Sequence, residues 1–255
     1  MKDYIFFLRP LAAFMVVCTH ITATLETSTY YFVYILNNIS FWAVPVFIMI
    51  SGALILSSSK PDRKAFYVKK IKRLLPAFLI WNLFYLVLFQ LGSQQYSLSE
   101  RLYQFVMRLY SASHLWYLPM FLALMLLAPV IKIFIEGIKP TQKFLYFLLV
   151  LCFIELVIRQ IKAIEPDLKW ITIFNEYIIF FVTGYVLDRY VKVKNLFYII
   201  LPLIFLVIAG LLLEIDTDYQ FFSYISLTNT LISILVYLLF LNFVARLRLF
   251  FINIF

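Results

Sequence analysis

Charged residues are scarce in this sequence, and hydrophobic residues are in excess. Lys, Arg, Asp and Glu together make up 14% of the 255 residues, whereas hydrophobic residues make up 64%. Ordinary globular domains contain roughly 45–50% apolar residues, and a soluble protein of this size could not bury the difference. The composition therefore excludes an ordinary soluble fold and indicates an integral membrane protein.

Glycine, cysteine and histidine are also rare, and each shortage excludes a type of site. The five glycines form no Gly-rich loop that could cradle a phosphate. The two histidines are far apart, and Cys18 and Cys152 lie inside apolar runs, so no metal-ligand spacing exists. No Gly-x-Ser-x-Gly segment marks a hydrolase nucleophile. We therefore expect no metal and no bound cofactor, and any phosphate must be held by cationic side chains.

Long apolar runs occupy most of the chain. The 28 phenylalanines and 18 tyrosines suit lipid-facing surfaces and the aromatic belts at membrane interfaces. A helix needs about 20 apolar residues to span the hydrocarbon core. Eight windows approach that length: 5–22, 39–56, 74–91, 115–131, 143–161, 171–187, 195–213 and 227–245. The sequence predicts an all-α, polytopic membrane protein with about eight transmembrane helices in a single domain, 1–255.

The distribution of lysine and arginine predicts the orientation of these helices. Most of the basic residues fall in alternate loops on one side, including the loop 60–73 and Lys132, whereas the loop 214–225 on the other side is acidic. The basic side should face the cytoplasm, with both termini inside. The net charge of +9 is then mostly a topology signal and requires no nucleic-acid partner. The segment 29–38, interrupted by Asn37 and Asn38, is interpreted as interfacial.

Arg9 and His20 lie in the first window, eleven residues apart. At about 100° per residue, this spacing is about 20° more than three full turns, so both residues share one helix face, about 16 Å apart. A charge inside a span costs roughly 3 kcal/mol and usually has a function. The alternative is that Arg9 extends to the headgroups and His20 is an interfacial polar tip. We favour a functional pair, with Arg9 near the cytoplasmic end.

The loop 60–73 is densely basic and ends in Lys69-Lys70-Ile71-Lys72-Arg73. One interpretation is a cytoplasmic anchor attracted to anionic lipid. The other is a binding site for a phosphorylated donor, in which Lys70 acts as a point charge and Arg73 as a fork. Both interpretations remain open from the residues alone.

Three further residues near the predicted outer side are candidates for binding an acceptor. His114 and Trp116 lie at the outer end of the fourth window, where an aromatic belt is the simplest interpretation. Topology places His114 on the same membrane side as His20, which favours a functional role. Glu176 follows Asn175 in the outer half of the sixth window and could orient a histidine or fix an acceptor hydroxyl.

Several stretches, taken in order, resemble the acyltransferase-3 family of bacterial membrane O-acyltransferases. The first runs from Leu8-Arg9-Pro10 to Thr19-His20 and is similar to the family's Arg, ten residues, His pattern. The others are Val44-Pro45-Val46-Phe47 to Ser51-Gly52, the basic motif 70–76, His114-Leu115-Trp116 and, more weakly, 180–185. The His-Leu-Trp segment resembles the branch that O-acetylates surface polysaccharides. Lys70 stands where the family usually has an arginine.

The resemblance implies a reaction, a location and roles for these residues. The donor is acyl-CoA, commonly acetyl-CoA, and the acceptor is a hydroxyl of a cell-surface glycan or lipid-linked sugar outside a bacterial cytoplasmic (inner) membrane. Arg9, Lys70 and Arg73 would hold the donor's phosphates. His20 would be the general base, because a histidine's ordinary pKa lies near neutrality. His114, Trp116 and Glu176 would contact the acceptor.

The resemblance also implies ten core helices, of which this chain carries eight and lacks the family's late Tyr-Leu-x-His segment. The apolar run that ends at Phe255 is similar to the start of a ninth span. We therefore expect C-terminal helices to be missing, and an inactive fragment that assembles with other subunits is one alternative. A transporter or flippase for a glycan or anionic substrate, with Arg9 and Glu176 as pathway charges, is the other.

Overall fold

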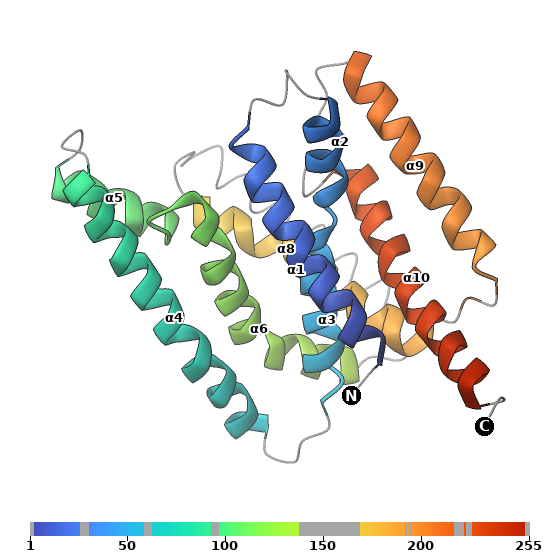
Figure 1. The fold of residues 1–255 in the computed structure, drawn as a ribbon. Coiled ribbons are helices and arrows are strands. Elements are labelled where there is room, and N and C mark those ends of the chain that lie inside the picture. The colour runs from blue at the N-terminus through green and yellow to red at the C-terminus, as the bar shows by residue number, and fades with distance from the viewer. Residues whose placement is uncertain are drawn as a thin grey trace. The chain divides into compact units, whose positions relative to one another are not determined.

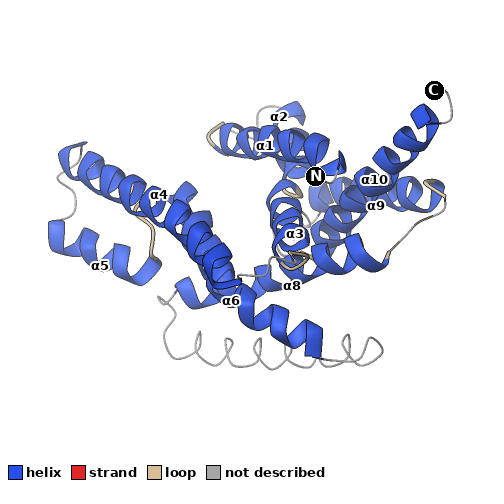
Figure 2. Ribbon diagram, turned by 90° about the horizontal axis from the view of Figure 1, so that it is seen from below, coloured by secondary structure: helices blue, strands red, loops and turns tan. Residues whose placement is uncertain are grey.

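The computed structural model describes residues 3–25, 31–58, 63–92, 97–137, 169–191, 193, 195–216, 222 and 226–252. In these ranges all regular secondary structure is helical (Figures 1 and 2). The helices are α1 Asp3–Ala23, α2 Tyr31–Ser40, α3 Ala43–Ile55, α4 Arg63–Gly92, α5 Leu98–Arg108, the 3-10 helix η1 Ser113–Trp116, α6 Tyr117–Gly137, α8 Lys169–Tyr190, α9 Phe197–Asp216 and α10 Leu227–Ile252. The predicted all-α class is confirmed.

Five stretches of the described residues are long and apolar enough to cross a membrane. They are Asp3–Ala23, Tyr31–Ile55, Tyr67–Leu88, His114–Glu136 and Leu227–Val244, and Phe197–Leu213 is a shorter apolar helix. The predicted window 143–161 lies outside the described residues, and the window 171–187 falls within α8. The predictions of eight spans and of two cytoplasmic termini stay predictions.

The structure corrects the interpretation of segment 29–38 as interfacial. Its described part is helix α2, which continues into α3 as one 25-residue apolar stretch. Asn37 does not need the headgroup region, because it accepts a hydrogen bond from Thr22 of α1, and Asn38 is buried, with 5% of its surface exposed. A hydrogen bond to α1 therefore replaces contact with water for Asn37.

Two segments that were predicted to be loops contain helices in the structure. Residues 63–73 of the basic loop are the first turns of the 30-residue helix α4, since lysine and arginine favour helix and no glycine or proline interrupts them. The loop between windows 74–91 and 115–131 contains α5, which starts with a capping box: Ser97 accepts from the Glu100 amide, and Glu100 accepts from the Ser97 amide.

The chain divides into two compact units, Met1–Ser57 with Phe180–Phe255, and Ser58–Ile179. In the first unit α1 packs against α2, α3 and α10, around fully buried side chains such as Leu8, Met49 and Tyr237. In the second unit α6 packs against α4 and η1, around Met120 and Leu124. The prediction of a single membrane-embedded domain stays a prediction.

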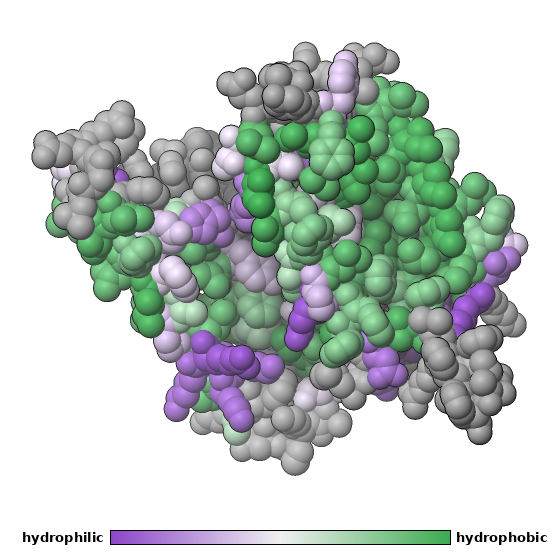
Figure 3. Space-filling view, viewed as in Figure 1, coloured by the Kyte–Doolittle hydropathy of each residue, from purple (hydrophilic) through white to green (hydrophobic). Residues whose placement is uncertain are grey.

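Large apolar side chains also cover much of the outer surface. Phe6, Phe14 and Ile21 on α1 are 65%, 61% and 56% exposed, and α4, α6 and α9 carry similar side chains. Figure 3 shows this apolar surface, with a hydrophilic cluster over the beginning of α4. In water such a surface would drive aggregation, so it indicates contact with lipid tails.

Two glycines allow a close contact between α3 and α8 in the first unit. A β-carbon on Gly52 of α3 would lie 1.7 Å from the Phe181 carbonyl oxygen, and one on Gly184 of α8 would lie 2.0 Å from the Met49 carbonyl oxygen. The two helices therefore touch main chain to main chain, as small residues permit in membranes. The stretches ending in Ser51-Gly52 and containing Gly184, both part of the family resemblance, are the two sides of this contact.

Candidate functional site

Helix α1 carries Arg9 and His20 along one edge of its packed face. The helix is continuous from Asp3 to Ala23, with Pro10 inside it, so the eleven-residue spacing places both side chains on one face. Each follows a buried residue: Leu8 is 0% exposed and Thr19 is 6% exposed, whereas Arg9 and His20 are exposed. The structure thus brings these two predicted site residues onto one accessible stripe of one helix.

The first turn of α1 is tied to two other helices. The Tyr4 hydroxyl donates to Asp188 Oδ1 of α8 at 2.7 Å, and its oxygen lies 2.7 Å from the hydroxyl oxygen of Tyr237 on α10. The rings of the two tyrosines meet edge to face, with centroids 5.6 Å apart. The Tyr237 hydroxyl oxygen also lies 3.4 Å from the Gly184 carbonyl oxygen. This buried network fixes the rotation of α1 at the end nearer Arg9.

The other end of α1 is tied to α2. Thr19 donates to Ser40 Oγ at 2.7 Å, and Thr22 donates to Asn37 Oδ1 at 2.9 Å. Ser40 in turn donates to the Asn37 carbonyl at 2.7 Å. Thr19 directly precedes His20, so this hydroxyl cluster holds the backbone that carries the predicted base.

Helix α4 carries Lys70 and Arg73 on an exposed side. Lys69, Lys70, Lys72 and Arg73 are all exposed, whereas Tyr67 is 7% exposed on the opposite side of the helix. At about 100° per residue the four cations span roughly 160° of the helix surface. We call these four residues the basic strip. Such a strip can bind phosphate groups through several charge-assisted contacts.

His114 and Trp116 lie on the 3-10 helix η1, just before α6. The imidazole of His114 is exposed, and its centroid is 4.7 Å from that of Tyr85 on α4, with the rings at 75°. The Trp116 ring is half-buried and packs against Tyr177 of α8, with the two ring centroids 5.2 Å apart. The backbone of Glu176, next to Tyr177, is helical, and its side chain lies outside the described residues. The predicted acceptor residues His114 and Trp116 therefore share one short turn.

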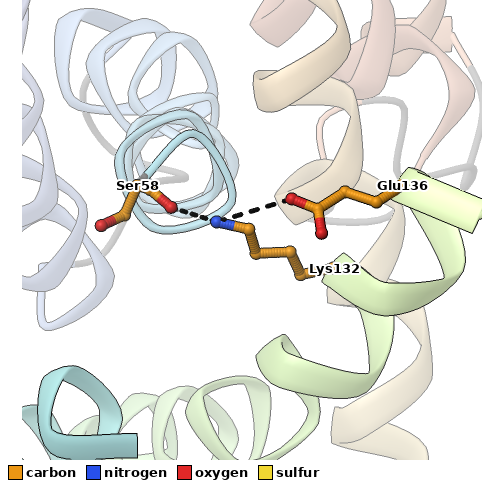
Figure 4. A network of polar contacts seen from close by, with 3 residues as sticks. All are labelled: Ser58, Lys132 and Glu136. Carbon is orange, nitrogen blue, oxygen red and sulfur yellow. Dashed lines mark hydrogen bonds and ion pairs between the residues drawn. The ribbon is translucent and has the colours of Figure 1, made fainter. Parts of the chain in front are cut away.

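The predicted position of Lys132 in a loop was wrong. It was assigned to a cytoplasmic loop, but it lies within α6 and is 5% exposed. Its ammonium group donates to the Ser58 carbonyl and lies 3.9 Å from Glu136 Oε1; Figure 4 shows both contacts. A buried lysine needs such partners, since an unpaired charge there would be costly. Its position at the edge of the window 115–131 made a loop the simpler prediction.

Other polar residues with structural roles were also missed. Asp188 and Tyr237 join the Tyr4 network, and Asn82 of α4 is 3% exposed and accepts from the Ser111 amide at 2.7 Å. The available signal was a polar residue inside or beside an apolar window, which usually has a partner or a function. Among the residues that the structure describes, no three His, Cys, Asp or Glu side chains come together to hold a metal ion.

The site residues divide between two regions with different chemistry. One is a helix edge with an arginine and a histidine, suited to binding an anion and removing a proton. The other carries the basic strip at the beginning of α4 and, near the opposite end of that helix, the turn with His114 and Trp116. A sequence model of a family described as an acyltransferase domain matches residues 2–255. No curated protein and no solved structure matches the chain.

Proposed function

Because this chain belongs to the acyltransferase-3 family and is a membrane acyltransferase, we propose that it moves an acyl group, most simply acetyl, from cytoplasmic acyl-CoA to a hydroxyl of a cell-surface glycan or its lipid-linked precursor. The observation that carries the proposal is the placement of Arg9 and His20 along one exposed edge of the continuous helix α1. Because the donor is made inside the cell and the acceptor lies outside it, the acyl group must cross the bilayer. The edge of α1 that carries Arg9 and His20 would follow that path.

His20 is the general base in this proposal. Its imidazole takes the proton of the acceptor hydroxyl while that oxygen attacks the thioester carbonyl, and a tetrahedral intermediate forms. Collapse of the intermediate breaks the carbon–sulfur bond and releases the CoA thiolate, which accepts the proton from the imidazolium. The products are the O-acyl glycan and free CoA. Thr19, held by Ser40, keeps the backbone of the base in place.

Arg9 and the basic strip bind the donor's phosphates. Arg9 carries the guanidinium fork that suits a phosphate, and Lys70 and Arg73 add charge at exposed positions of α4. The strip is also attracted to anionic lipid headgroups, which keeps it at the inner surface where the donor is made. His114, Trp116 and Glu176 contact the acceptor at the outer side, in a multi-pass protein of a bacterial inner membrane.

The test is acyl transfer by purified protein with radiolabelled acetyl-CoA and a surface-glycan acceptor. His20→Ala should lower the rate constant for transfer by at least about 100-fold, since general bases contribute roughly that much or more. Thr24→Ala is the matched control, because Thr24 is exposed four residues away and bonds only locally, to the Ile21 carbonyl. Transfer at the normal rate by a stably inserted His20→Ala protein would contradict the proposal. Movement of glycan without consumption of acetyl-CoA would favour a flippase instead.

A further inference from the structure

The segment just before the turn that carries His114 is bonded to a buried side chain, that of Asn82. Asn82 is 3% exposed, although its neighbours Trp81 and Leu83 are 49% and 63% exposed. Its Nδ2 donates to the Phe78 carbonyl at 2.9 Å, and its Oδ1 accepts from the Ser111 amide at 2.7 Å. The first bond fixes the orientation of the side-chain amide, so that its acceptor oxygen is aimed at Ser111.

The backbone around Ser111 follows an irregular path that needs such a partner. Helix α5 ends at Arg108, and the φ of 59° at its C-cap residue Leu109 lies in the left-handed region that leucine rarely adopts. Ala112 is extended, and η1 then starts at Ser113. Ser111 therefore lies between two helices and belongs to neither. The hydrogen bond from its backbone amide to Asn82 ties this segment to α4.

The same side of α4 also contacts the imidazole. Tyr85 lies three residues after Asn82, which is close to one helical turn, and its ring meets His114 edge to face at 4.7 Å. Asn82 thus sets the backbone position of the turn, and Tyr85 limits the tilt of the ring. Two contacts from one helix face define where His114 lies.

We propose that Asn82 is a positioning residue for the acceptor site: it acts through His114 and does not touch the substrate. This inference rests on the proposed function, in which His114 contacts the acceptor hydroxyl or its sugar. Lys70 lies twelve residues before Asn82 on α4, about 18 Å along the helix axis. A change at Asn82 should therefore alter the KM for the acceptor and leave the KM for acyl-CoA unchanged.

The molecule offers a close control for this substitution. Asn242 of α10 has the same two contacts: its Nδ2 donates to the Leu238 carbonyl at 2.7 Å, and its Oδ1 accepts from the Val193 amide at 3.2 Å. It too ties a segment outside the helices to a helix. Asn82→Leu and Asn242→Leu remove the same pair of hydrogen bonds in two places.

The experiment measures both KM values for the purified chain of 255 residues. Asn82→Leu should raise the acceptor KM by about tenfold, the effect of one buried hydrogen bond, and change the acyl-CoA KM by less than about twofold. Asn242→Leu should change neither KM by more than about twofold.

If Asn82→Leu is not stably inserted, Asn82→Ser replaces it. The serine hydroxyl can bond the Phe78 carbonyl but is too short to reach Ser111. The same rise in the acceptor KM is therefore expected.

A double mutant separates positioning from general damage. In a His114→Ala background, Asn82→Leu should cause no further rise in acceptor KM, since residues that act as a unit are not additive. An equal rise in both backgrounds, or an equal rise in the two KM values, would overturn the inference. A rise in the acceptor KM with His114→Ala but not with Asn82→Leu would also overturn the positioning role of Asn82. The proposed function would then still stand. No rise with His114→Ala would remove His114 from the proposed function itself.

Discussion

Gly184 of α8 lies directly against the main chain of Met49 in α3, where a β-carbon would come within 2.0 Å of a carbonyl oxygen. Gly52 and Phe181 make the reciprocal contact three residues away on each helix. These glycines are therefore needed for packing, and the crossing that they allow holds together the unit that contains α1.

Replacing Gly184 with alanine should destabilise the protein by at least about 2 kcal/mol, because a main-chain clash cannot be relieved by a change of rotamer. Gly210→Ala is the control, since a β-carbon there would meet the end of the Phe222 side chain at 2.8 Å and alanine favours helix by about 1 kcal/mol. Thermal unfolding in one detergent measures both variants. Equal stability of Gly184→Ala and the unaltered chain would contradict the close crossing.

Removing the Tyr4 hydroxyl should loosen the N-terminal end of α1. Tyr4→Phe removes hydrogen bonds to Asp188 and Tyr237, at a cost of about 1–3 kcal/mol for a buried network. Tyr198→Phe, at a tyrosine that is 70% exposed, should have almost no effect on the unfolding temperature. If both variants unfold at the same temperature, the network does not hold the helix.

The basic strip should control donor binding. Lys70→Ala and Arg73→Ala should each raise the KM for acyl-CoA by about three- to tenfold and leave the acceptor KM unchanged, because each removes a charge-assisted phosphate contact. Lys70→Arg should lower the donor KM, since arginine can bind a phosphate with two parallel bonds. Arg189→Ala, at an exposed arginine at the end of α8, is the control. A donor KM that is insensitive to all three strip variants would leave the strip as a lipid anchor.

The stabilisation of helix α5 by its N-terminal capping box should depend on pH. Hydrogen bonds from the amide and then the hydroxyl of Ser97 hold the pKa of the Glu100 carboxyl below its ordinary value. The stabilisation is therefore present above the unfolded-state pKa of about 4.3 and is lost as the pH falls through the lower folded-state pKa. Ser97→Ala should raise the Glu100 midpoint only part of the way, because the amide bond remains. An NMR titration of Glu100 measures this, and an unchanged midpoint would show that the hydroxyl does not contribute.

The sequence predicted the features that depend on composition and helical spacing. Apolar content predicted the membrane class, and the eleven-residue spacing predicted that Arg9 and His20 share a face, because α1 is continuous through Pro10. The prediction of a loop between the windows 74–91 and 115–131 missed α5, although the capping box at Ser97 and Glu100 is a local signal for its start. These features are local, and local geometry follows from the residues themselves.

Tertiary partners were not predictable in the same way. The Asn37 and Asn38 pair suggested an interface, because hydropathy does not reveal that Thr22 of another helix satisfies an asparagine. Lys132 was assigned to a loop for the same reason, since only the fold supplies the Ser58 carbonyl. Asn82, inside an apolar window, gave no sign that it holds the His114 turn. The contacts of Asn37 with Thr22, of Asn82 with Ser111 and of Lys132 with Ser58 join residues that are 15, 29 and 74 positions apart.

The most direct test of the central claim is acyl transfer across a sealed membrane. The protein is inserted into vesicles with its basic face accessible, labelled acetyl-CoA is added outside, and the glycan acceptor is enclosed within. We predict that label appears on the enclosed glycan, that His20→Ala abolishes it, and that Arg9→Ala raises the acetyl-CoA concentration required. Label that remains on the donor with the unaltered chain, or label transferred equally well by His20→Ala, would contradict the account.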